Sequence, residues 1–384
     1  MVPPFVCQLF LIAALNHGSA VPGDGAVLTW RGKQMTVAEA ASELTPTALH
    51  ELELWSAWCE ERGYRAVLDD DGRALLIASS SRSDLDRLSE RARKAGMLVE
   101  HLAPLPQRDP GETFLTPEWG RGQHVPERDT ATVVLVESEA DFQSLLAVLE
   151  SMKPQLAGQL PRHQAVPAFH NAEASMGALL SAPPDIEIGT VWRVDNEVVN
   201  RLARLLLYRR FGELPYWLEL GLAWNVEQGV MGDLYSFPGR EEFVSVDDHE
   251  GWRKELQREF KARRKEPLRI EELAAWTGPE WSDKAAALAW GMGQFLGTQP
   301  SDKVAAALEE LRLDMKEHGV HVEADGSWKM VAGYKTSPAR QNEILARHLG
   351  DDYLQRASAF FCAGKIDSTP GSGDARRATR SRKN

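Results

Sequence analysis

The sequence is poor in cysteine and in long apolar segments, and it has no excess of basic residues. Its 384 residues include three cysteines, too few for a disulfide scaffold or a cysteine-rich zinc site. The apolar segment near its start, Phe5–Leu15, is shorter than the roughly 20 residues that a membrane-spanning helix needs. Acidic residues outnumber basic ones by 56 to 44, giving a net charge of −12. This balance disfavours nucleic acid as a partner, because counterion release rewards lysine and arginine.

Several motifs that carry chemistry are also missing. The chain has no P-loop, no Gly-x-Gly-x-x-Gly fingerprint and no Gly-x-Ser-x-Gly nucleophile elbow. The closest pair of histidines, His318 and His321, has Gly319 between its members and is a weak pattern for a metal site. Apolar residues make up 43% and charged residues 26%, ordinary values for a globular protein. The length predicts two or three modules with a sizeable core.

The two ends of the chain differ from the body. Small residues, Gly18 and Ala20, follow the apolar segment and predict a secretory signal peptide over residues 1–20. The protein would then be exported, periplasmic or secreted, with no transmembrane anchor after cleavage. The first residues carry no lysine or arginine, so a buried N-terminal strand or helix is the alternative. Residues 364–384 are basic, with Ile366 as their one large apolar side chain, which predicts a disordered, solvated tail.

Between these ends the patterns predict an α+β fold. Residues 21–101 read as an N-terminal α/β region, residues 102–130 as a linker rich in proline and glycine, and residues 231–363 as a mainly helical C-terminal region. Residues 131–230 combine a buried strand near Thr132–Val136, strands near 165–169 and 176–180, and two helices over 195–211 and 215–227. C-terminal helices are expected near 248–265, 269–276, 281–297, 301–318 and 338–360, with a strand or loop at 328–334.

The twelve tryptophans and the cysteines are interpreted as core residues. Trp55 and Cys59 share helical spacing, as do Trp217 and Trp224, so packing is favoured over a sugar-binding platform or a thiol nucleophile. Cys59 and Cys362 lie on distant segments, and we expect two separate buried thiols rather than a disulfide.

The segment Phe211-Gly212-Glu213-Leu214-Pro215-Tyr216-Trp217-Leu218, continued by Gly221-Leu222-Ala223 and Glu227, resembles a known frame. It is similar to the metal-binding core of the peptidase MA-like gluzincins, the thermolysin-type zinc metallopeptidases. There, one helix carries H-E-x-x-H, and a second helix after a Leu-Pro turn carries the third zinc ligand. The resemblance covers roughly residues 130–297. It implies a small sheet with two crossing helices and an edge strand over a cleft.

The residues that zinc catalysis requires are absent from this frame. The resemblance places the first histidine at Asn200, the catalytic glutamate at Arg201, the second histidine at Arg204 and the glutamate ligand at Leu220. Asparagine is a poor zinc ligand, leucine offers no ligand atom, and arginine has no lone pair to donate. Zinc is expected in the family, but here we predict no metal, no cofactor and no catalytic residue. A one-residue shift would offer Glu219 but no histidine, since residues 190–230 contain none.

Other residues are candidates for a changed site. Arg204 is predicted to pair with Glu219 or Glu227 where the metal would lie, with Arg201 as a further partner, because a guanidinium suits a carboxylate. The alternative is that these arginines face water. Tyr208 lies on the same helix face as Asn200 and Arg204. Additional cleft candidates come from the segment expected over the cleft: His163, His170 and Glu173.

These features favour a non-catalytic relative of a zinc metallopeptidase that is exported and binds a peptide or protein in the former active-site cleft. A hydrolase with a relocated site built on the cleft candidates is one alternative. An exported structural scaffold is another. The oligomeric state is left open by the sequence.

Overall fold

The computed structural model describes residues 27–363, apart from 45, 70–71, 80–84, 106–129, 153–159, 161–167, 172–175, 182–191, 237–250, 264–265, 279–281, 323–327 and 332–333. The predicted signal peptide, the basic tail and most of the predicted linker lie outside the described residues, as do His163 and Glu173. In the part that is described, no helix is long and apolar enough to cross a membrane.

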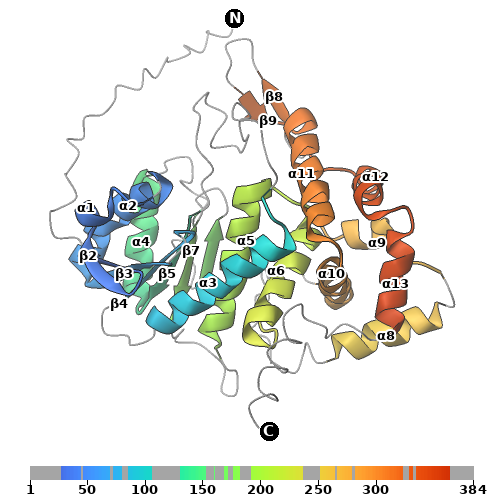
Figure 1. The fold of residues 1–384 in the computed structure, drawn as a ribbon, viewed down its shortest axis with the longest axis horizontal. Coiled ribbons are helices and arrows are strands. Elements are labelled where there is room, and N and C mark those ends of the chain that lie inside the picture. Colours follow the sequence, from blue (N-terminus) through green and yellow to red (C-terminus); the bar gives the residue numbers. More distant parts are fainter. Residues whose placement is uncertain are drawn as a thin grey trace, which may run out of the picture.

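A mixed sheet of seven strands organises the N-terminal part of the molecule (Figure 1), in the order β2-β1-β3-β4-β5-β7-β6. β1 and β3, β4 and β5, and β5 and β7 pair in parallel, whereas the other neighbours are antiparallel. The strands are β1 (Val27–Trp30), β2 (Lys33–Thr36), β3 (Tyr64–Leu68), β4 (Ala74–Ser79), β5 (Ala131–Val136), β6 (Ala168–Asn171) and β7 (Met176–Leu180).

Helices cover both faces of this sheet, which explains why its central strands β4 and β5 are mostly apolar and almost entirely buried. Leu75 and Ile77 of β4 face one side, where α1 (Val37–Ala40), α2 (Pro46–Arg62) and α4 (Glu139–Met152) complete an apolar cluster. Leu76 and Ala78 face the other side, against α3 (Leu85–Leu102) and α5 (Val194–Phe211). The alternation follows from the two-residue period of a strand.

The sheet continues through the boundary that was predicted at residues 102–130. β4 pairs directly with β5, so that Leu76 lies opposite Val133. The N-terminal region and the module at 131–230 therefore share one sheet and the apolar clusters on its two faces. The proline- and glycine-rich composition of residues 102–130 is a local signal. The pairing of β4 with β5 is a contact between strands far apart in the sequence, which composition does not predict.

The rest of the chain is mainly helical, and the overall α+β class is as predicted. Figure 1 shows these helices beside the sheet layers. They are α6 (Tyr216–Met231), α8 (Trp252–Ala262), α9 (Ile270–Ala274), α10 (Asp283–Leu296), α11 (Ser301–His318), α12 (Pro338–Leu349) and α13 (Tyr353–Ala363), with a hairpin of β8 (Val320–Val322) and β9 (Trp328–Met330). The single helix predicted over 338–360 is two helices, because Gly350 with φ of 97° ends α12.

Two glycines allow α6 and α10 to cross in backbone contact. A Cβ placed on Gly293 would lie 1.8 Å from the carbonyl oxygen of Gly221, and one placed on Gly221 would lie 2.3 Å from the carbonyl oxygen of Ala289. Any side chain at these positions would force the helices apart. The crossing fixes α6 against the C-terminal helices, and tryptophans around it, including Trp217, Trp224 and Trp290, are buried as predicted.

Candidate functional site

The site is built on the hairpin of α5 and α6. Gly212, with φ of 67°, ends α5 and donates its N–H to the Tyr208 carbonyl at 2.7 Å. Pro215 precedes α6, and its carbonyl accepts from the Leu218 and Glu219 amides at 2.8 and 3.0 Å. The short turn makes the two helices antiparallel neighbours, so that residues 196–204 of α5 face residues 219–227 of α6.

Glu227 is the centre of the buried polar contacts between the two helices. Its side chain is fully buried, and its Oε1 accepts from Asn196 Nδ2 at 3.0 Å. Oε2 accepts from Asn200 Nδ2 at 3.1 Å. The chain that follows α6 adds two backbone donors to Oε1, the amides of Tyr235 at 2.8 Å and Ser236 at 3.1 Å. One carboxylate therefore joins α5, α6 and the segment after α6.

Burial sets the protonation behaviour of this carboxylate. Loss of hydration raises the pKa of Glu227 to about 7, although the four hydrogen bonds to the carboxylate act in the opposite direction. Asn200 Oδ1 is buried and has no hydrogen-bond partner. Rotation of the Asn200 amide would present this oxygen to Oε2, so the cluster has an acceptor ready for a protonated Glu227.

One helical turn further along α5, Arg204 forms an ion pair with α6. Its Nε donates to Glu219 Oε1 at 2.6 Å, with both side chains largely buried. This is one of the two pairings that the sequence predicted; the other, to Glu227, is replaced by the asparagines.

Arg201 has a partner within its own helix. Its Nη1 donates to Glu197 Oε2, and Glu197 lies one turn earlier on α5. Burial lowers the pKa of Arg201 to about 9, the Arg204 charge acts in the same direction, and Glu227 opposes both. The predicted contact of Arg201 with Glu219 or Glu227 is therefore not formed as a hydrogen bond, because Glu197 is nearer.

His170 lies near these arginines, on the edge strand β6. Its Nδ1 is buried and makes no hydrogen bond. Burial lowers its pKa well below the usual value, and the charges of Arg204 and Arg201 lower it further. The imidazole is therefore neutral at pH 7, and the cleft candidate His170 is close enough to both arginines for their charges to act on it.

The remaining predicted residues have simpler surroundings. Leu220 is fully buried and belongs to the apolar core. Tyr208 is half-buried on α5. In the described residues no three histidine, cysteine, aspartate or glutamate side chains gather as a metal site would require. The donor set at Asn200, Arg201, Arg204 and Leu220 does not fit zinc, since it holds no imidazole, no thiolate and no carboxylate.

Sequence reasoning missed Asn196 and Glu197 and gave Glu227 the wrong partner. Asn196, Glu197 and Asn200 repeat the spacing of H-E-x-x-H one turn before the predicted register, with asparagine in both histidine places. The i, i+4 asparagines could have been noticed as a pair on one helix face. Their shared partner 27 and 31 residues away could not.

A cavity of about 300 Å³ adjoins the site through Glu219. Its walls come from the first turns of α6 and α12, the end of α9 and α11. The main apolar contributors are Leu214, Tyr216, Trp217, Trp276 and Met315. The Tyr216 and Trp276 rings meet edge to face with centroids 5.0 Å apart. A cavity of this size and lining suits one apolar side chain or a small ring.

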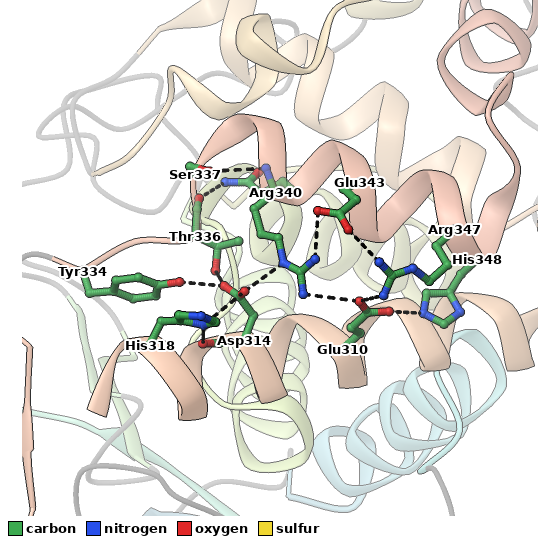
Figure 2. A network of polar contacts seen from close by, with 11 residues as sticks. Glu310, Asp314, His318, Tyr334, Thr336, Ser337, Arg340, Glu343, Arg347 and His348 are labelled. Atoms are coloured by element: carbon green, nitrogen blue, oxygen red, sulfur yellow. Dashed lines mark hydrogen bonds and ion pairs between the residues drawn. The ribbon is translucent and has the colours of Figure 1, made fainter. Parts of the chain in front are cut away.

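Polar contacts between α11 and α12 hold one wall of this cavity (Figure 2). Asp314 accepts from Tyr334 at 2.7 Å, Thr336 at 2.9 Å and Arg340 at 3.0 Å, and these donors hold the pKa of Asp314 below its usual value. Glu310 accepts from His348 at 2.7 Å and also pairs with Arg347. The contacts fix the segment leading into α12, which lines the cavity.

A direct bond connects this wall to α6. Gln341 Nε2 donates to the Thr336 carbonyl at 2.7 Å, and Gln341 Oε1 accepts from Trp217 Nε1 at 2.9 Å. All of these partners are buried. The cavity is therefore shaped by rigid side chains on both walls.

Comparison with known proteins adds no assignment: no protein-family model matches the chain, and no curated protein sequence matches it.

Proposed function

We propose that this protein is a non-catalytic relative of the gluzincin zinc peptidases, exported from the cytoplasm, which binds a peptide or protein in the cleft beside α5. The proposal depends on one observation above all. Where a zinc peptidase would hold its metal between two helices, α5 and α6 are held by hydrogen bonds from Asn196 and Asn200 to the buried Glu227. The amides take the places of imidazoles, and the carboxylate is satisfied without a cation.

Loss of the metal leaves a surface suited to binding. β6 forms the end of the sheet, and in the described part of the chain no strand pairs with its outer edge. Edge strands offer backbone N–H and C=O groups to an extended peptide, which can add as a further strand. His170 belongs to this edge strand, and Arg204 of α5 lies close enough for its charge to act on the imidazole, so a peptide added there would approach polar side chains.

The family relation is tested by restoring the metal site. Asn196→His with Asn200→His would place two imidazoles one turn apart opposite Glu227, the ligand set of a His₂Glu zinc site. We expect near-stoichiometric zinc in the purified double variant and less than about one-tenth per chain in the native protein, measured by elemental mass spectrometry.

A matched control uses the register that the sequence predicted. Asn200→His with Arg204→His and Leu220→Glu carries the same ligand types, but position 220 lies in the apolar core. We expect this variant to bind less zinc than the first. If both variants fold, by circular dichroism, and neither takes up zinc, the relation to zinc peptidases loses its structural support.

Peptide binding needs its own assay. The full native chain is titrated with fluorescein-labelled random hexapeptides, and binding is followed by fluorescence anisotropy while mass spectrometry monitors cleavage. We expect binding without cleavage. Peptides that are cleaved, or none that bind at 100 μM, roughly the weak end of useful peptide affinity, would contradict the proposal. Export is tested by fractionating cells that express the complete chain.

One observation favours a second function, a hydrolase with a relocated site. His170 is neutral at pH 7, and its buried Nδ1 has no hydrogen-bond partner. Hydrolysis that is abolished by His170→Ala and unaffected by Arg347→Lys on α12 would favour this alternative over binding alone.

A further inference from the structure

Hydrogen-bond donors are left without partners around Asn200. Arg204 uses its Nε for Glu219, and the described residues supply no partner for its two Nη groups. Arg201 Nε, a donor, and His170 Nδ1, a donor or an acceptor according to the imidazole tautomer, are buried and make no hydrogen bond. A buried donor such as Arg201 Nε costs free energy unless a ligand or water satisfies it.

The charges around these donors favour an acceptor with negative charge. Arg201 and Arg204 both disfavour a proton on His170, so the space near the imidazole has a positive potential. Glu197 pairs with Arg201, and Glu219 pairs with the Nε of Arg204, so the two glutamates balance the two positive charges. Neither contact uses the Nη groups of Arg204. Two Nη groups of one guanidinium form a planar fork that fits a carboxylate.

An apolar cavity lies on the Glu219 side of this ion pair. Glu219, the partner of Arg204, also lines the cavity beside Tyr216 and Trp276. The charges of Arg204 and Glu219 both act on the Tyr216 hydroxyl, which places that wall near the ion pair. The site therefore combines hydrogen-bond donors for a carboxylate with an apolar recess, and Glu219 connects the two.

We infer that the cleft recognises the free C-terminus of a peptide, with the terminal carboxylate on the Nη fork of Arg204 and an apolar terminal side chain in the cavity beside Trp276. Preceding residues of the peptide would add to the edge of β6. The inference rests on the proposed function, because it names the kind of peptide that the cleft binds.

A pair of peptides that differ only at the C-terminal group distinguishes recognition of the free C-terminus from peptide binding in general. Fluorescein-labelled hexapeptides with random first residues and a terminal phenylalanine are made with a free carboxylate and with a carboxamide, and both are titrated into the full chain. We expect the free acid to bind at least about tenfold more tightly, the size of effect that a charge-assisted hydrogen bond supports. Equal affinities would overturn the inference and leave the proposed function standing. Absence of binding by either form would overturn both.

Two variants test whether Arg204 holds the terminal carboxylate. Arg204→Lys keeps a cation for Glu219 but lacks the fork, so we expect it to lose the preference for the free acid. Arg347→Lys is the matched control, since Arg347 also pairs with carboxylates but lies on α12. A preference that survives Arg204→Lys would overturn the assignment.

Trp276→Ala tests the cavity. We expect it to abolish discrimination between peptides ending in phenylalanine and peptides ending in glycine, while the preference for a free carboxylate persists. Discrimination that persists in a folded Trp276→Ala variant would contradict the placement of the terminal side chain.

Discussion

Replacing Glu227 by glutamine is expected to stabilise the protein at alkaline pH. The pKa of Glu227 is raised to about 7 in the folded protein, against 4.5 as its ordinary value. A carboxyl group with a raised folded-state pKa favours folding below its unfolded pKa, and this contribution is lost as the pH rises through the folded pKa. Native stability should therefore fall between about pH 4.5 and pH 7 because of this group.

The size of the effect follows from the shift. Each pKa unit corresponds to about 1.4 kcal/mol, so a shift from 4.5 to about 7 costs about 3 kcal/mol above pH 7. The Glu227→Gln variant retains an oxygen for Asn196 Nδ2 and the amides of Tyr235 and Ser236. Its new NH₂ group would face Asn200, whose unpartnered Oδ1 can rotate to accept it.

Urea unfolding at pH 5 and pH 8 measures the difference in free energy of unfolding between the Glu227→Gln variant and the native protein. We expect the variant to gain up to about 3 kcal/mol relative to native at pH 8 and little at pH 5. Other titrating groups are common to both proteins and cancel in the difference. Glu227→Leu is the control: it leaves the surrounding donors unsatisfied and should destabilise at both pH values. A Glu227→Gln difference that does not change with pH would refute the reasoning.

Other predictions concern the supporting structure. Gly293→Ala should lower the free energy of unfolding in a urea titration by about 3 kcal/mol or more, because its Cβ would meet the Gly221 backbone at 1.8 Å. Gly251→Ala, with open space around the added Cβ, should be nearly neutral in the same titration. Asp314→Leu should cost about 2–3 kcal/mol by leaving three donors without their acceptor, and a thermal melt unchanged from native would contradict the network in Figure 2. Cys59 should resist a thiol reagent until urea unfolds the chain, since it is buried and its pKa is raised to about 12. Mass spectrometry of the labelled peptides measures this, and labelling of Cys59 in the native state would contradict the prediction.

Several of these features could be predicted from local sequence because local physics controls them. The alternating and continuous apolar runs indicated the strands, and Gly212 with the Leu-Pro turn indicated that α5 and α6 form a hairpin. The hairpin, in turn, made a pairing of Arg204 with a carboxylate of α6 such as Glu219 predictable, since a tight turn makes the two helices antiparallel neighbours. The absence of histidine from residues 190–230 was also visible in the sequence.

Tertiary structure decided what could not be derived from spacing. The register of β4 against β5 joins two regions that are far apart in the sequence, and such pairing depends on which apolar faces are available to be covered. Glu227 acquires its backbone donors from Tyr235 and Ser236 only after the chain folds back along α6. Its raised pKa, like that of Cys59, follows from burial, which no single segment determines. The sequence by itself thus determined that residues 190–230 contain no histidine. The fold determined that an amide–carboxylate cluster lies between the two helices, because hydrogen bonds between distant segments form only where packing brings them together.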